Sequence, residues 1–122
     1  MHDVTFIEFL LARITEDRED AYQRIDEEVE RLRRDGLPET TRDDLITMEE
    51  SDHWRRPLAE CEAKRRIVEE HQVWQPTGYR FTDGRQIDVC AVDEQHWPCR
   101  TMKAVGSVYA DHPDFRSEWK TV

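Results

Sequence analysis

The chain has 122 residues, a net charge of −10, and nearly equal hydrophobic and charged fractions, 37% and 38%. So small an apolar fraction favours long helices with one apolar stripe each and disfavours a β-sandwich or barrel. The excess of acidic residues, 28 against 18 basic ones, argues against a duplex-binding protein. We find no apolar run of membrane-spanning length and no export signal, and we therefore expect a soluble, cytoplasmic protein with no membrane partner.

The first predicted element is a helix over about residues 4–34. Apolar residues recur there at helical spacing, at Phe6, Leu10, Ile14, Ala21, Ile25, Val29 and Leu32. Asp3 or Thr5 can cap its start, and Gly36 followed by Pro38 is a stop signal. Because this helix is longer than most globular helices, we expect it to pair with another helix of the chain or with a second copy, as a homodimer.

A second helix is predicted to begin at Thr41, which with Asp44 resembles a capping arrangement. Pro57 interrupts it, and we expect the helix to resume with this proline in its first turn and to end at His71. It should lie antiparallel to the first helix, with Cys61 in the core. Residues 1–74 are therefore predicted to form a long antiparallel helical hairpin.

The pattern changes after residue 75. The stretch "GYRFTDGRQIDVC" alternates around Asp83-Gly84, a turn signal, and so predicts a small β-hairpin that ends at Cys90. A helix of about three turns is predicted from Pro98. The predicted fold class is mainly α with a small β-hairpin (α+β), in one domain over 1–122 whose residues 75–122 form the β-hairpin and the C-terminal helices.

The last predicted element is a short helix near the C-terminus. Asp111-His112-Pro113 resembles a cap followed by a first-turn proline. Phe115 and Trp119, four residues apart, then lie on one face of this helix.

Three residues are candidate ligands of a structural zinc ion. Cys90 ends a strand, Cys99 lies in the first turn of a helix whose dipole favours a thiolate, and His71 ends a helix. Two residues compete for the fourth position, since His96 is the better donor by type and Asp93 has the spacing of a C-x-x-C pair. The sequence slightly favours a metal-free version of the site, in which the cysteines pack as small apolar residues, over bound zinc, and a Cys90–Cys99 disulfide is the third alternative.

Three blocks of the chain resemble a family of small actinobacterial and actinobacteriophage proteins of unknown function. The blocks are "FIEFLLARITEDREDA", "LAECEAKRRIVEEH" and "WPCRTMKAVGSVYADHPDFRSEW". The resemblance implies a zinc-ribbon-like cluster in which His71, Cys90 and Cys99 match the family's histidine and two of its cysteines. The chain differs from the family pattern at Asp93, where the family has the second cysteine of a C-x-x-C pair.

No catalytic constellation accompanies these motifs. Asp111 and His112 are the nearest approach to an acid–base pair, but neighbouring residues in a turn rarely face one substrate. We therefore expect a non-enzymatic accessory or interaction protein that binds another protein, encoded by a phage and acting on a host protein if the resemblance holds. The alternative is a nucleic-acid-associated protein, which requires a basic patch formed by Arg80, Arg85, Arg100 and Lys103.

Overall fold

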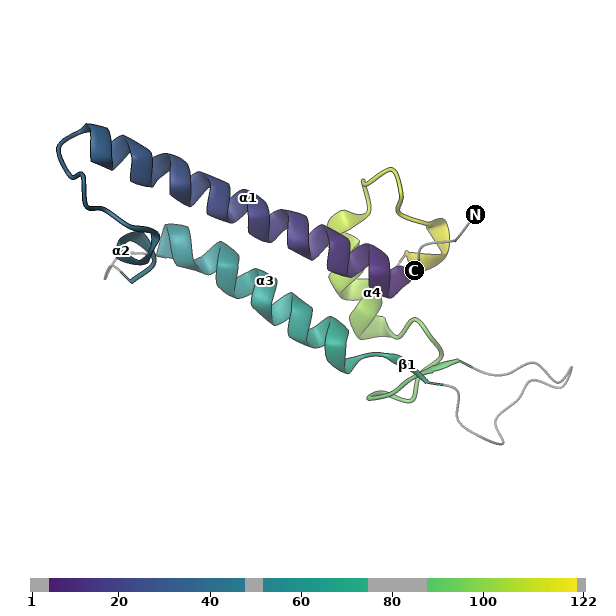
Figure 1. Ribbon diagram of the computed structural model, residues 1–122. Coiled ribbons are helices and arrows are strands. Elements are labelled where there is room, and N and C mark those ends of the chain that lie inside the picture. The colour runs from purple at the N-terminus through teal and green to yellow at the C-terminus, as the bar shows by residue number, and fades with distance from the viewer. Residues whose placement is uncertain (1–4, 48–51, 75–87, 121–122) are drawn as a thin grey trace, which may run out of the picture. The chain divides into compact units, whose positions relative to one another are not determined.

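The structure is a computed structural model that describes residues 5–47, 52–74 and 88–120 (Figure 1). Its elements in chain order are α1 (Phe6–Arg34), α2 (Arg42–Thr47), α3 (Asp52–Glu70), β1 (Val73–Trp74), β2 (Val89–Cys90), α4 (Arg100–Gly106) and the 3₁₀ turns Ser107–Tyr109 and Ser117–Trp119. The two strands pair antiparallel. The predicted fold class, mainly α with a small β-hairpin, is confirmed. No helix among the described residues is long and apolar enough to cross a membrane.

The chain divides into two compact units. Unit 1 consists of Met1–Arg13 and Lys64–Val122, and unit 2 consists of Ile14–Ala63. The helices α1 and α3 each contribute residues to both units. The predicted single domain, with its division after residue 74, stays a prediction.

Helix α1 has the predicted bounds and the predicted apolar stripe. Six of the seven stripe residues are buried and the last is half-buried. The Thr5 hydroxyl accepts the backbone N–H of Glu8 at 3.1 Å, so one of the two proposed caps satisfies an otherwise unpaired donor of the first turn. Apolar periodicity and one capping residue are therefore enough to define this helix.

The core of unit 2 joins α1, α2 and α3. Ile25 and Val29 of α1 and Leu45 of α2 are buried together, and Trp54 and Leu58 of α3 pack against them. The helices thus pair within the chain in this unit, which is one of the two arrangements that the sequence leaves open. Burial of a Leu or Ile side chain contributes roughly 1.5–3 kcal/mol, so these contacts far outweigh the helix propensity of a six-residue segment such as α2.

Polar contacts set where α2 begins. The Thr41 backbone N–H donates to the Asp44 carboxylate at 2.8 Å, and the Asp44 N–H donates to the Thr41 hydroxyl at 3.4 Å, which confirms the predicted capping arrangement. Arg42 then binds Asp26 of α1 through two hydrogen bonds of 2.6 and 2.7 Å. This hydrogen bonding is the largest cause of the lowered pKa of Asp26. The start of α2 is therefore attached to α1.

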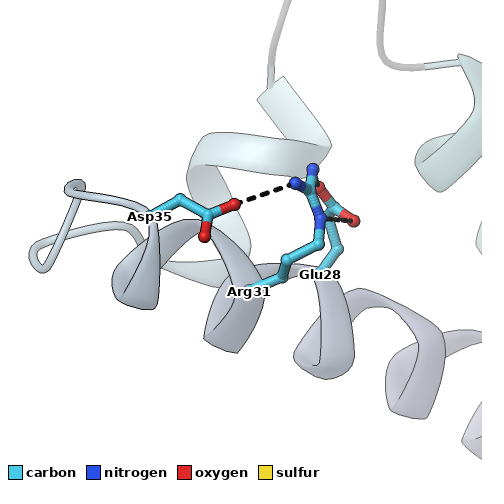
Figure 2. A network of polar contacts seen from close by, with 3 residues as sticks. All are labelled: Glu28, Arg31 and Asp35. Atoms are coloured by element: carbon cyan, nitrogen blue, oxygen red, sulfur yellow. Dashed lines mark hydrogen bonds and ion pairs between the residues drawn. The ribbon is translucent and has the colours of Figure 1, made fainter.

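The last turns of α1 carry a network of exposed charges. Figure 2 shows the Arg31 guanidinium between Glu28 and Asp35, with an Arg31–Asp35 distance of 3.1 Å. Hydrogen bonding to Arg31 lowers the pKa of Glu28. Arg31 also lies near the negative end of the helix dipole. Because Arg31 and Asp35 are exposed and Glu28 is only half-buried, the network contributes little to stability and mainly keeps this surface polar.

The structure corrects the start of α3. The sequence places Pro57 in the first turn of a resumed helix, but α3 already begins at Asp52 and contains the proline in its interior. Pro57 cannot donate a hydrogen bond to the carbonyl one turn earlier. Packing of Trp54 and Leu58 on the unit 2 core, on either side of the proline, accounts for the continuity of the helix.

In unit 1, aromatic rings cover the start of α1. Phe6 stacks on Trp119 with ring centroids 4.8 Å apart, and Phe9 meets Trp119 at 5.1 Å and Phe115 at 5.8 Å. Gly106 ends α4 directly beneath Phe6, because a Cβ at this glycine would lie 2.6 Å from the tip of the Phe6 ring. Because glycine has no side chain, α4 can approach α1 closely at this point.

The C-terminal elements are shorter than the sequence predicts. Helix α4 begins at Arg100 because Cys99, with an extended backbone, is its N-cap. The last helix is a single 3₁₀ turn, Ser117–Trp119, so Phe115 precedes it, although the Phe115 and Trp119 rings still meet at 5.5 Å. The predicted Asp83-Gly84 turn lies outside the described residues.

The close approach at Gly106 gives a stability prediction. Replacing a helical glycine by alanine gains up to about 1 kcal/mol in helix propensity, whereas overpacking a core costs about 1–3 kcal/mol. The Phe6 ring is 3% exposed and stacked on Trp119, so it cannot move aside easily. We expect Gly106→Ala to lower the free energy of unfolding by about 1 kcal/mol or more, measured by urea denaturation.

The control is Val108→Ala, because Val108 is 62% exposed. A change of no more than about 0.5 kcal/mol is expected there. A Gly106→Ala protein as stable as the parent would contradict the close approach of α4 to α1.

Candidate metal centre

Four residues of unit 1 place their side chains in one group. They are His71, Cys90, Asp93 and Cys99, and their ligand atoms all lie within 4.8 Å of one another. Cys90 and Cys99 are almost fully buried, His71 is 8% exposed, and Asp93 is half-buried. All three cysteines of the chain are free thiols, so the structure contains no Cys90–Cys99 disulfide.

The histidine comes from the end of a helix. The His71 backbone N–H donates to the Ile67 carbonyl at 3.0 Å, which closes the last turn of α3, and β1 begins two residues later. Gln72, between them, accepts the N–H of Ala91 at 2.9 Å through its backbone carbonyl. The end of α3 is thereby attached to the segment that carries Cys90 and Asp93.

Cys90 and Asp93 lie on either side of a tight turn. The Cys90 carbonyl accepts the Glu94 N–H at 2.9 Å, and the Cys90 N–H donates to the Gln95 carbonyl at 2.8 Å. Glu94 has φ 57°, a left-handed conformation that costs a residue other than glycine roughly 1–2 kcal/mol. Strain of this kind collects at functional sites. The turn brings the Asp93 carboxylate to 3.8 Å from the Cys90 sulfur.

Cys99 enters the group from the N-cap position of α4. Its carbonyl accepts the Lys103 N–H at 3.0 Å, and its thiol makes no capping hydrogen bond. The Gln95 side chain accepts the Arg100 N–H at 3.2 Å, which joins the turn after Cys90 to the start of α4. Three separate segments of unit 1 are therefore hydrogen-bonded around the four side chains.

The structure leaves His96 out of the group. His96 is exposed and forms a backbone bridge with Val89. Directly paired residues point to the same face of a sheet, and consecutive residues point to opposite faces. Because Val89 precedes Cys90, the His96 side chain faces away from the Cys90 thiol. Of the two residues that the sequence offers for the fourth position, Asp93 is the one that the structure brings to the other three.

The distances from the His71 ring nitrogen to the other three ligand atoms are close to those of a tetrahedral zinc site. With Zn–S bonds of about 2.3 Å and Zn–N or Zn–O bonds of about 2.0–2.1 Å, tetrahedral angles place S and N or O ligands about 3.5 Å apart and N and O ligands about 3.3 Å apart. The His71 Nδ1 atom lies 3.3 Å from the Cys90 sulfur, 3.6 Å from the Cys99 sulfur and 3.2 Å from the Asp93 carboxylate.

The charges of the group also favour a cation. Burial raises the pKa of the Cys99 thiol to about 11, and the neighbouring Cys90 and Asp93 add to the rise, against a lowering by the Met102 backbone amide. Two thiols and a carboxylate lie so close together that deprotonation of a thiol, which adds a negative charge, is disfavoured. A divalent ion reverses this balance, because a coordinated thiol is deprotonated. Two thiolates with an imidazole are typical of zinc.

The other residues singled out in the sequence lie elsewhere. Cys61 is buried in unit 2, as predicted for a core residue. His112 packs edge-to-face on the Phe9 ring, and its Nδ1 accepts the Asp114 N–H at 3.0 Å. Arg80 and Arg85 lie outside the described residues, so the predicted basic patch stays a prediction. The sequence does not reveal the strained Glu94 backbone, because a glutamate gives no signal of a left-handed conformation.

The fold and this group define a mainly helical protein with a histidine, cysteine and aspartate centre beside a small β-hairpin. Residues 3–121 match the model of a family of unknown function (DUF6221), and the chain belongs to this family. The resemblance to a family of unknown function is confirmed. No curated protein and no solved structure shows a significant match to the chain.

The geometry predicts that Asp93 contributes to metal affinity and that His96 does not. Removing a group that only supports a ligand costs 10–100-fold in affinity, so we expect Asp93→Ala to weaken zinc binding by roughly 100-fold or more. The exposed His96→Ala control should change affinity no more than about twofold. Competition with a chromophoric chelator measures both values, and the reverse order of effects would refute the Asp93 assignment.

Proposed function

We propose that the chain is a non-enzymatic interaction protein whose unit 1 is a binding module stabilised by structural zinc. The observation that supports this proposal is the group of His71, Cys90, Asp93 and Cys99, three of them buried, whose ligand atoms lie within 4.8 Å of one another. Four protein ligands leave no open position for a substrate, and closed sites of this kind have structural roles. The three free thiols suit a reducing compartment such as the cytoplasm.

The size of the elements in unit 1 explains why a metal is useful there. Its strands have two residues each and α4 has seven. Elements so short bury little apolar surface on their own, and small modules of this kind are often stabilised by a metal. In this proposal zinc joins the end of α3, the turn after β2 and the start of α4. The chain's own residues supply two thiolates, an imidazole and a carboxylate.

Exposed apolar side chains in unit 1 support a protein partner. Val73 and Trp74 of β1 are 44% and 48% exposed, and Val92, in the turn between Cys90 and Asp93, is 54% exposed. Tryptophan is enriched among residues that dominate binding energy at protein interfaces. In keeping with the phage and actinobacterial resemblance, we take the partner to be a protein of a bacterial host.

Metal removal tests the first part of the proposal. We expect native mass spectrometry to show one zinc ion per chain, lost after treatment with a chelator. A ligand at a hundred times its Kd stabilises the folded state by about 2.7 kcal/mol, so the Tm of the chelated protein should fall by roughly 10 °C. An unchanged mass and Tm after chelation would rule out the zinc site and leave a hydrogen-bonded cluster of thiols, imidazole and carboxylate.

Partner capture tests the second part. We expect the zinc-loaded chain to retain a specific protein from a bacterial host lysate, and Trp74→Ala to reduce the amount retained by roughly tenfold, as for an interface residue of high energetic weight. Val108→Ala, which removes another exposed apolar side chain of unit 1, is the matched control and should retain as much as the parent. The proposal fails if no protein is retained specifically, or if the chelated chain retains as much of the host protein as the zinc-loaded chain does.

A further inference from the structure

A groove of about 540 Å³ lies in unit 1, on the segment that precedes the Cys99 thiol. Its apolar lining consists of Phe6, Trp97, Pro98 and Trp119, and its charged lining consists of Lys103, Arg116 and Glu118. The volume falls within the range of roughly 300–1,000 Å³ that is usual for ligand sites. The lining combines aromatic surface with basic side chains, although the protein as a whole has a net charge of −10.

The charges of the groove leave one cation available. Arg116 forms an ion pair with Glu118 at 3.5 Å, so these two opposite charges balance each other. The Arg116 guanidinium also lies 5.5 Å from the centre of the Trp119 ring. Lys103 is half-buried, and no described residue forms an ion pair or a hydrogen bond with its ammonium group. A half-buried lysine side chain beside apolar surface gains from an anionic partner, because the surroundings screen the charge less than water does.

We propose that this groove binds the C-terminal residue of a partner polypeptide, with its carboxylate on Lys103 and an apolar side chain against Trp97 and Pro98. This inference rests on the proposed role as an interaction protein and names the chemistry that the partner presents. A single available cation matches a single carboxylate. A polyanion such as nucleic acid is a poorer match, because the net negative charge of the protein repels it. The end of a polypeptide can also occupy a groove of this size, because the chain does not have to continue out of the other side.

The metal centre fixes two walls of the groove. Trp97 and Pro98 directly precede Cys99, and the Trp97 N–H donates to the Asp88 carbonyl at 3.0 Å. Lys103 donates its backbone N–H to the Cys99 carbonyl, so its position on α4 is set from the same residue. A zinc ion held by Cys99 would therefore help to order both the apolar wall and the cation, and we expect peptide binding to weaken when the metal is removed.

Two peptides that differ only at the C-terminal group test the inference. The probes are acetyl-Gly-Gly-Phe with a free carboxylate and the same peptide as its amide, each titrated into the zinc-loaded full chain. A charge-assisted hydrogen bond contributes enough for the acid to bind roughly tenfold more tightly than the amide. The indole N–H signals of Trp97 and Trp119 should shift in NMR spectra, and those of Trp54 and Trp74 should stay in place, because only the first two line the groove.

Lys103→Met should abolish the preference for the acid. The matched control, Lys120→Met, changes the net charge equally at an exposed site outside the groove and should keep the preference. Both variants are checked for the parent's indole spectrum and Tm before titration. Equal binding of acid and amide, shifts at Trp54 or Trp74 alone, or displacement of the peptide by a short oligothymidylate would each overturn the inference.

These results separate the inference from the proposed function. If a host protein is retained equally by the parent and by Lys103→Met, the chain is an interaction protein that binds its partner elsewhere, and the groove assignment is wrong. If the acid peptide binds through Lys103 but no host protein is retained, the groove assignment holds and the proposed interaction function is wrong.

Discussion

Unit 1 is built around the burial of ionisable groups. Two thiols and an imidazole are buried, with a carboxylate at the edge, at the point where the end of α3, the turn after β2 and the start of α4 meet. Burying polar groups without full partners costs free energy, and hydrogen bonds among thiols recover little of it because sulfur is a weak donor and acceptor. A cation among the four ligand atoms satisfies all of them together. The short strands and the short helix then need only to hold the ligands in place.

Much of the helical part follows from residues that are close in the sequence. The spacing of apolar residues defines α1, and the Thr41–Asp44 capping arrangement defines the start of α2, because both depend on periodicity and local hydrogen bonds. Pro57 shows where local rules fail. Its chemistry predicts a helix start, yet the packing of Trp54 and Leu58 on the unit 2 core keeps α3 continuous through it.

The candidate site shows the same limit. The sequence places His71, Cys90 and Cys99 at element ends, and those positions are right or nearly so. It cannot decide between Asp93 and His96, because the decision depends on the left-handed Glu94 backbone and on the bridge between Val89 and His96. A turn of this geometry reverses the chain, so that the third residue after Cys90 returns to its thiol and the sixth residue faces away.

A carboxylate at Asp93 gives the group a different character from a third cysteine thiolate without changing its charge. Aspartate and a cysteine thiolate each bring one negative charge, so the balance of the four ligands with a divalent ion is the same. Oxygen is a harder ligand than sulfur, so a site with this carboxylate would accept a wider range of metals than one with a third thiolate. Asp93 is also the least buried of the four residues, so the group is open to solvent on the side of this carboxylate. The same turn carries the exposed Val92, and the segment that ends at Cys99 forms a wall of the groove. If the group binds zinc as proposed, loss of the ion would disturb both surfaces that are proposed to bind a partner.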